Sequence, residues 1–287
     1  MSRDFLLLHS DLHEILRELT EGVPIHFETK VDALEEKQHG VSVTLSDGTQ
    51  EDYDLVVGAD GIHSHVRELL FGKEGFSYSG LRIWLYMMPV GKEMPSEPND
   101  LFGEGEYIGV FPTRIGKLGV LFLASVPAGE PDSPQERIVR LRERFGDFAW
   151  MIPDILQSMH NPMEIFADDI DQVSLETWYR GRVALLGDAA HAVSPTAAMG
   201  GAMALEDAHV LAEELRMVDA TQVEQALVGY VARRKPRVAE IRHTSDFLIR
   251  IASVKHPALA FVRNTVMHLI PPSLLLRGME TILDTQV

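Results

Sequence analysis

The residues with the clearest capacity for chemistry lie where an apolar run at 183–186 ends in Gly187-Asp188. The run predicts a strand buried on both faces, and the glycine allows a tight turn after it. Ligands of open α/β sheets bind beyond the carboxyl ends of the strands. Asp188 is therefore placed to accept a charge-assisted hydrogen bond from a ligand hydroxyl, such as that of a ribose.

A loop with Pro195, Gly200 and Gly201 follows this turn and leads into a helix predicted over 202–217. The free backbone amides at a helix amino terminus favour a negative group. This loop can therefore hold a pyrophosphate or a flat ring system on one side of the turn while Asp188 holds a hydroxyl on the other.

A second acidic turn follows the buried strand predicted at 55–58. Here Asp60-Gly61 precedes Ser64 and a helix that carries Arg67. Arg67 pairs either with this segment or with a phosphate, and the residue pattern leaves both alternatives open.

Both turns resemble motifs of one enzyme family. The order Gly-Asp-Ala-Ala-His at 187–191, then proline, a glycine-rich turn and Glu-Asp-Ala at 206–208, is similar to the second flavin-binding motif of class A FAD-dependent aromatic monooxygenases, the para-hydroxybenzoate hydroxylase-like flavoproteins. The pattern Gly-Ala-Asp-Gly-x-x-Ser-x-x-Arg at 58–67 resembles the middle motif of the same family. The two motifs occur in the family's order, with room for a substrate domain between them.

The resemblance implies a role for each motif. Asp188 would bind a hydroxyl of the flavin's ribose or ribityl chain, and the glycine-rich turn would approach the isoalloxazine ring with backbone groups. Asp60 with Gly61 would serve both FAD and the nicotinamide cofactor, NAD(P)H. His191 is expected to be structural, because the chemistry belongs to the cofactor. The implied cofactor-binding residues are Gly187, Asp188, Pro195, Gly200, Gly201, Asp60, Gly61, Arg67 and His9.

His9 stands where the family has an arginine that reaches the flavin phosphates. A histidine is only conditionally charged near neutral pH, and it cannot form the bidentate fork of a guanidinium. The sequence also lacks the Gly-x-Gly-x-x-Gly fingerprint that binds the ADP half of FAD. We therefore expect an amino-terminally truncated family member whose missing βαβ unit is encoded upstream or supplied by a partner chain.

The implied function is that of an oxidoreductase in which NAD(P)H reduces FAD and the reduced flavin activates O2 to hydroxylate or epoxidise a small aromatic or polyunsaturated substrate. Two alternatives stay open. The chain is a non-catalytic fragment or partner-dependent subunit that does not bind FAD alone, or it is a flavin dehydrogenase or reductase on the same scaffold. Aromatic side chains between Trp84 and Phe122 are candidates for a hydrophobic substrate pocket, although most are expected in the core. The catalytic base stays unassigned.

Composition limits the function classes. A formal net charge of -17 and a pI near 5.1 disfavour a nucleic acid or an anionic membrane as partner. The absence of cysteine excludes disulfides, thiolate catalysis and cysteine-ligated metals, and we expect no metal site. Without a signal peptide or a run of about 18 apolar residues, we expect a cytoplasmic protein with no integral membrane association. The basic cluster at 233–237 is interpreted as the solvated end of a helix.

Resemblance and periodicity together indicate an α/β fold: a partial FAD-binding Rossmann-like domain with an inserted antiparallel-sheet substrate domain and a helical carboxyl terminus. The expected divisions are 1–75 and 176–218 for the FAD-binding parts, 76–175 for the substrate sheet and 219–287 for the terminal helices. The local patterns predict an amphipathic helix from 10 to about 22, a strand at 25–27, a hairpin from 41 to 54, and a helix over 222–252 interrupted near Pro236.

Overall fold

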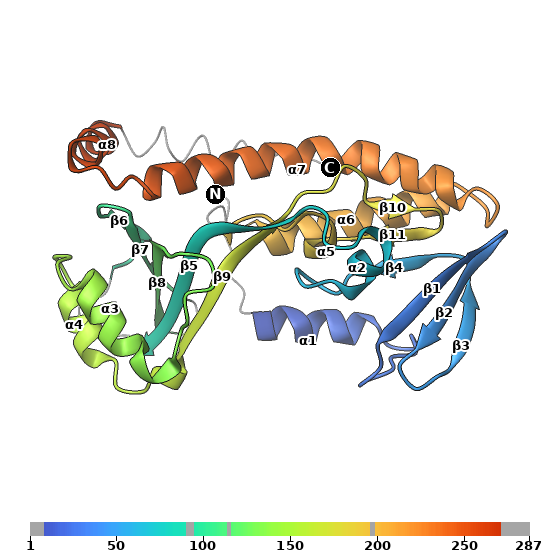
Figure 1. Cartoon of the computed structure of the whole chain (residues 1–287), viewed down its shortest axis with the longest axis horizontal. Helices are drawn as coiled ribbons and strands as arrows, with labels where there is room; N and C mark the ends of the chain where they lie inside the picture. Colours follow the sequence, from blue (N-terminus) through green and yellow to red (C-terminus); the bar gives the residue numbers. More distant parts are fainter. Residues whose placement is uncertain (1–8, 90–94, 114–115, 196–198, 271–287) are drawn as a thin grey trace. The chain divides into compact units, whose positions relative to one another are not determined.

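The computed structural model describes residues 9–89, 95–113, 116–195 and 199–270, in a mixed α/β arrangement (Figure 1). The chain separates into two compact units. Unit 1 comprises residues 1–28 and 82–168, and unit 2 comprises residues 29–81 and 169–287. The division into four functional segments remains a prediction.

The described chain contains runs of strands separated by helices, and its last four elements are helices. Its α-helices are α1 (His9–Leu19), α2 (His65–Phe71), α3 (Arg137–Phe145), α4 (Ile152–Ser158), α5 (Asp188–His191), α6 (Gly200–Arg216), α7 (Val223–Ala252) and α8 (Pro257–Leu269). Its strands are β1 (Val31–Lys37), β2 (Gly40–Leu45), β3 (Gln50–Tyr53), β4 (Val56–Gly58), β5 (Phe76–Pro89), β6 (Asn99–Phe102), β7 (Glu106–Pro112), β8 (Lys117–Ser125), β9 (Ile165–Val173), β10 (Tyr179–Arg180) and β11 (Val183–Leu185).

The sheet that positions the two acidic turns has the strand order β10-β11-β4. The strands β11 and β4 pair in parallel, with Val183 opposite Val56 and Leu185 opposite Gly58. The predicted strands before both turns are thereby confirmed. Because parallel strands end at the same edge, the Asp60-Gly61 and Gly187-Asp188 turns leave the sheet side by side.

The antiparallel sheet β1-β2-β3 confirms one expectation and corrects another. The hairpin is present, with Val41 paired to Tyr53. The strand expected at 25–27 is wrong, since these residues form no strand and the preceding partner of β2 is β1 at 31–37. That strand has the sequence VDALEEK and is mostly exposed, so its extended form depends on pairing with β2 and is not visible in its own hydrophobic pattern.

Most of the antiparallel sheet expected between 76 and 126 lies in unit 1, where β7 pairs with β8 over Glu106–Pro112. The full sheet order is β6-β7-β8-β5-β9. Phe122 and Phe145 are completely buried here, with ring centroids 5.0 Å apart, and Trp84 meets Phe145 edge-on at 6.2 Å. Of the aromatic candidates for a substrate pocket, at least Trp84 and Phe122 are therefore core residues.

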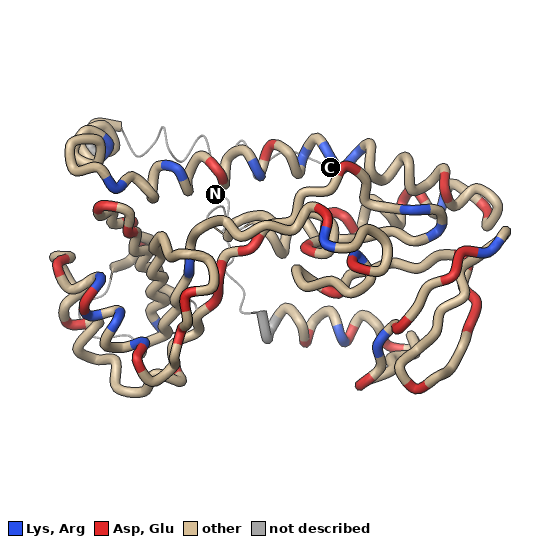
Figure 2. Tube along the Cα trace, viewed as in Figure 1, with Lys and Arg blue, Asp and Glu red and all other residues tan. Residues whose placement is uncertain are grey.

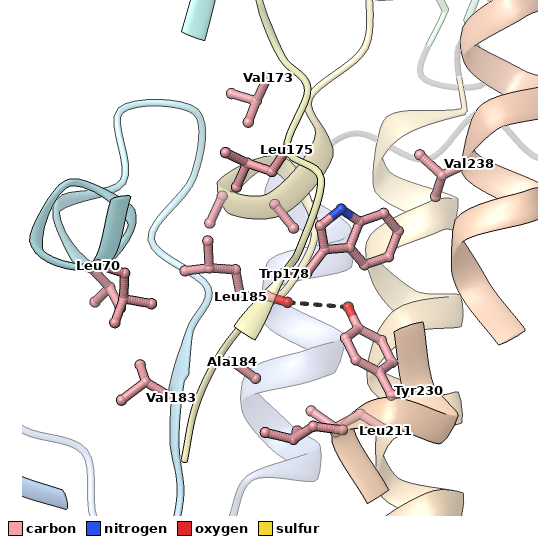
Figure 3. Packing of buried hydrophobic residues seen from close by; sticks show 14 of the residues in the cluster. Leu70, Val173, Leu175, Trp178, Val183, Ala184, Leu185, Leu211, Tyr230 and Val238 are labelled. Atoms are coloured by element: carbon pink, nitrogen blue, oxygen red, sulfur yellow. Dashed lines mark hydrogen bonds between the residues drawn. The ribbon is translucent and has the colours of Figure 1, made fainter. Parts of the chain in front are cut away.

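Unit 2 has its own apolar core, shown in Figure 3. Trp178 and Tyr230 are fully buried at its centre, with ring centroids 5.9 Å apart. The Tyr230 hydroxyl donates to the Leu185 carbonyl at 3.2 Å, drawn as the dashed line in Figure 3. This bond joins α7 to the last residue of β11 and so supports the strand from which the Asp188 turn begins.

The helix α7 continues through Pro236, so the predicted interruption is wrong. Proline lacks the N–H that would bond to the carbonyl four residues earlier, which weakens a helix interior. Buried residues on both sides of the proline, among them Tyr230 and Ile241, hold α7 against the core instead. Tertiary packing has overridden the local signal.

Among the residues that the structure describes, no helix is both long and apolar enough to cross a membrane. They also contain no group of three or more His, Asp or Glu side chains arranged to hold a metal ion.

We predict that Pro236→Ala stabilises the chain, because Pro236 is exposed and the alanine N–H regains the helical bond to the Ala232 carbonyl. The free energy of unfolding in urea should rise by about 1–2 kcal/mol. Gln225→Ala, at an exposed position of the same helix where no backbone bond is missing, is the matched control and should change it by less than about 0.5 kcal/mol. A destabilised Pro236→Ala variant would contradict the prediction.

Candidate functional site

The turn after β11 requires glycine at position 187. Gly187 has φ 60° and ψ -137°, and a Cβ there would lie 3.0 Å from the Cβ of Ala204 in α6. The Gly187 N–H donates to Asp207 Oδ2 at 2.9 Å. The turn is therefore held against α6 by both close packing and a hydrogen bond to a buried carboxylate.

Asp207, the aspartate of the Glu-Asp-Ala segment at 206–208, is the centre of a buried polar network. This network was not predicted from the sequence. The Asp207 side chain is completely buried and accepts a bond from Arg234 Nε at 2.6 Å, while His191 Nε2 lies 2.6 Å from Oδ2. Arg234 Nη1 also lies 2.7 Å from Glu206 Oε2. One carboxylate therefore ties together the turn after β11, the short helix α5 and the long helix α7.

The pKa values of this network follow from burial and charge. Burial by itself opposes the charged form of Asp207, but the bonds from His191, Arg234 and the Gly187 N–H outweigh it and lower the pKa of this carboxyl. Burial, followed by the negative charge of Asp207, raises the pKa of the neighbouring Tyr230 hydroxyl above its usual range. At neutral pH the network thus contains an ionised Asp207 and a neutral Tyr230.

The basic cluster at 233–237 is not solvated as expected. Arg234 is completely buried against Asp207. Arg237 is also buried, 3.8 Å from Glu206 and 3.5 Å from Glu240. Arg233 and Lys235 follow the prediction, since both are exposed, and Arg233 pairs at the surface with glutamates of α6. Helical spacing places successive arginines on different faces, and two of them point inward.

His191 is buried, and its ring lies 4.6 Å from that of Trp178, centroid to centroid. Together with its contact to Asp207, this agrees with the structural role expected for it. Its second ring nitrogen, Nδ1, has no hydrogen-bond partner among the described residues.

Asp188, in contrast, is exposed and makes no hydrogen bond or ion pair with the described part of the chain. A Cβ built on Gly200 would lie 4.0 Å from Asp188 Oδ1, so the carboxylate is next to the first residue of α6. The helix has no side-chain cap at Met199, and a Cβ built on Gly201 meets no atom within 4 Å. The first turn of α6 thus combines free amides, open space and a nearby carboxylate.

Pro195 is exposed in the loop between α5 and α6. The three residues that follow it, 196–198, lie outside the described chain, as does the side chain of His9, whose backbone begins α1. The structure therefore leaves the predicted roles of Pro195 and His9 as predictions.

Asp60 closes the second turn by capping α2. Its carboxylate accepts the N–H groups of His65 at 2.8 Å and Val66 at 3.0 Å, and also the hydroxyl of Ser64. Gly61, with φ 81°, permits the reversal between β4 and this helix. Asp60 thus acts as a helix cap, and its side chain stays exposed on the surface of the turn.

Arg67 connects the two turns. Its guanidinium is buried and donates from Nη2 to the Ile62 carbonyl at 2.6 Å and from Nη1 to the Ala189 carbonyl at 3.1 Å. It also lies over the Phe76 ring, 5.7 Å from its centroid. Burial lowers the pKa of Arg67 from its ordinary value. The sequence left open whether Arg67 pairs with its own segment or with a phosphate. In the structure it pairs with the protein segment.

These residues fit a flavin nucleotide. The uncapped terminus of α6 offers N–H donors to a negative or carbonyl-bearing ring edge, Asp188 offers an acceptor for a sugar hydroxyl, and the space beyond Gly201 admits a flat ring. FAD contains a flat ring with a carbonyl-bearing edge and sugar hydroxyls in one molecule, so it would match these protein groups.

Comparison with known proteins supports this interpretation. The sequence profile of the FAD binding domain family matches residues 6–144 and 149–245. The chain is 31% identical over 266 residues to 2-heptyl-3-hydroxy-4(1H)-quinolone synthase of Pseudomonas aeruginosa, covering 92% of this chain and 68% of that protein. The chain belongs to the class A FAD-dependent monooxygenase family. It also shares 31% identity with a flavin-dependent monooxygenase of Legionella longbeachae, covering 74% of this chain and 56% of that protein.

A solved structure with the same fold comes from this family. The crystal structure of Klebsiella pneumoniae HpxO complexed with FAD and uric acid aligns with a TM-score of 0.84 and 26% sequence identity, over 94% of this chain and 71% of that one. The chain thus spans about half to seven tenths of the proteins it resembles. Family membership, the FAD-binding character of the fold and its monooxygenase relatives agree with the resemblance of the two motifs.

We predict that Arg234→Met lowers the free energy of unfolding by about 3–5 kcal/mol, because it leaves Asp207 buried without its main counter-charge. Urea denaturation followed by circular dichroism measures the loss. Arg233→Met, which removes the adjacent surface arginine, is the matched control and should have little effect. In the double variant Asp207→Asn/Arg234→Met, the loss should be smaller than the sum of the single losses, because no unpaired charge remains. Additive losses would show that the two side chains are not coupled.

The lowered pKa of Asp207 predicts a dependence of stability on acid. A carboxyl whose pKa is lower in the folded state stabilises the protein above its unfolded pKa, and this contribution disappears as pH falls through the folded pKa. The wild-type chain should therefore lose stability steeply below about pH 4, given an ordinary Asp pKa near 3.9. Asp207→Asn should start less stable and show a shallower decline between pH 5 and pH 2 in urea titrations. Parallel curves for both proteins would contradict the role of Asp207.

Proposed function

We propose that this chain forms the flavin-binding and substrate-binding parts of a FAD-dependent monooxygenase that hydroxylates or epoxidises a small, flat aromatic or heteroaromatic substrate. In this proposal unit 2 contributes a partial Rossmann-like FAD-binding domain, and the antiparallel sheet contributes the substrate-binding domain. The observation that carries the proposal is the pair of turns after β4 and β11, held together by Arg67 and followed by the open terminus of α6.

Bound FAD would supply the redox chemistry, accepting electrons from NAD(P)H and passing them to O2. The chain's own residues would position it. Asp188 would accept a hydrogen bond from a ribose or ribityl hydroxyl, and the first amides of α6 would face the ring edge. Asp60, with Gly61, would serve FAD and NAD(P)H from the neighbouring turn while capping α2.

The substrate class follows from chemistry shared by relatives. One relative is named for a quinolone and another was crystallised with uric acid, and both compounds are flat nitrogen heterocycles. We propose an electron-rich heteroaromatic or aromatic substrate, which agrees with a cofactor that delivers an electrophilic oxygen. The catalytic base remains unassigned.

The same proposal includes a binding site for the ADP half of FAD. These 287 residues contain no Gly-x-Gly-x-x-Gly fingerprint. We propose that an upstream segment or a partner chain holds this half, while the chain described here holds the riboflavin half.

A substitution at Gly201 tests the flavin site without disturbing the fold. Gly201→Leu should retain the free energy of unfolding of the wild type, because a side chain at this position meets open space in the structure. It should weaken flavin binding by at least about tenfold, because the leucine occupies the space proposed for the ring. Riboflavin and FAD titrations followed by flavin fluorescence measure this, and Ala208→Leu at another exposed position of α6 is the matched control. If both variants bound flavin with equal affinity, the flavin would not bind at this turn.

The enzyme activity is tested on two forms, the 287-residue chain and the chain extended upstream in frame. At least the longer form should purify yellow or take up FAD, and then consume NAD(P)H and O2 when an aromatic substrate is added. Flavin binding without O2 consumption would instead assign a dehydrogenase or reductase. The flavoenzyme proposal fails when neither form can be reconstituted with FAD.

A further inference from the structure

The helix α8 exposes an apolar face that the rest of the described chain leaves uncovered. Its inner side packs on the end of α7, where Ala260 is buried and Arg263 donates to the Ile251 carbonyl at 3.0 Å. Its outer side carries large apolar side chains that are each half or more exposed. These are Leu259, Phe261, Val262, Val266 and Leu269.

Four of these five positions form a single stripe. Residues 259, 262, 266 and 269 recur at intervals of three and four, which places them along one side of a helix. Arg263 is next to Leu259 and Val266 by helical spacing, but it is buried and donates to the Ile251 carbonyl. An isolated exposed leucine needs no explanation, but a continuous stripe of this length indicates a surface that is covered in the working protein.

The charge of the surrounding sequence indicates what covers it. Residues 247–279 contain no Asp or Glu and four basic side chains, Arg250, Lys255, Arg263 and Arg277. The remaining 254 residues hold the other 22 of the 26 basic side chains and all 43 acidic ones, a formal charge of -21. Figure 2 shows α8 with no acidic segment, although red segments are spread over the rest of the chain. The net charge of the whole chain therefore conceals a basic, apolar segment at 247–279.

Two exposed cations precede α8 closely in the chain. Arg250 and Lys255, at the end of α7 and just before α8, are both exposed. A surface that satisfies this region must offer apolar groups to the stripe and negative charge to these two side chains.

We propose that α8 docks in the plane of an anionic lipid surface. The stripe enters the boundary between headgroups and acyl chains, to a depth of about 5–10 Å for a helix of this kind. Arg250 and Lys255 contact the anionic headgroups. This attachment needs no membrane-spanning helix, and it is independent of the proposed flavin chemistry because the stripe shares no residue with the flavin site.

The proposal is tested by cosedimentation of the full 287-residue chain with vesicles at low salt. The chain should sediment with vesicles of phosphatidylcholine and phosphatidylglycerol and remain in solution with pure phosphatidylcholine. Replacing Arg250 and Lys255 together by glutamine should weaken the binding about fivefold for each cation, and added NaCl should weaken it further.

The stripe is tested by Val262→Gln/Val266→Gln, which should abolish sedimentation with the anionic vesicles. Met163→Gln/Phe166→Gln replaces two exposed apolar residues of unit 1 and is the matched control that should still bind. Circular dichroism checks that both variants are folded. Equal binding by the two variants would overturn the proposal, as would no binding of the wild type to either vesicle. A wild-type self-association that the α8 variant loses in the absence of lipid would assign the face to a second copy.

Discussion

The arrangement of unit 2 depends on the charge of Asp207. This carboxylate has no access to water, and a buried charge without partners is costly. Its three donors come from the Gly187 turn, from α5 and from α7, so moving any of these elements would leave the charge incompletely paired. A contact inside the protein thus determines the shape of a turn that faces a ligand.

The polar residues of the two motifs consequently divide into two groups. Asp60, Arg67 and His191 bond mainly to the protein itself and hold the turns in place. Asp188 and the first amides of α6 remain open. Preorganisation of this kind lowers the entropy lost when a ligand binds, because the turn need not be ordered at that moment. Motif residues therefore contribute to binding even where they touch no ligand.

Charge is used differently at the two ends of unit 2. Near the proposed flavin site, opposite charges are buried in pairs and give rigidity. Near α8, Arg250 and Lys255 are exposed, as is the apolar stripe of the helix, and both suit an external surface.

The sequence alone determined the strands before both turns, the helix α2, the hairpin from 41 to 54 and the family, because buried strands, caps and tight turns depend on neighbouring residues. Only the tertiary structure decided the strand β1, the uninterrupted α7 and the burial of Arg234. These features arise from partners distant in the chain: β1 is extended because β2 pairs with it, and Arg234 is buried because Asp207 lies 27 residues before it. A local pattern contains no information about such a partner, and the fold supplies it.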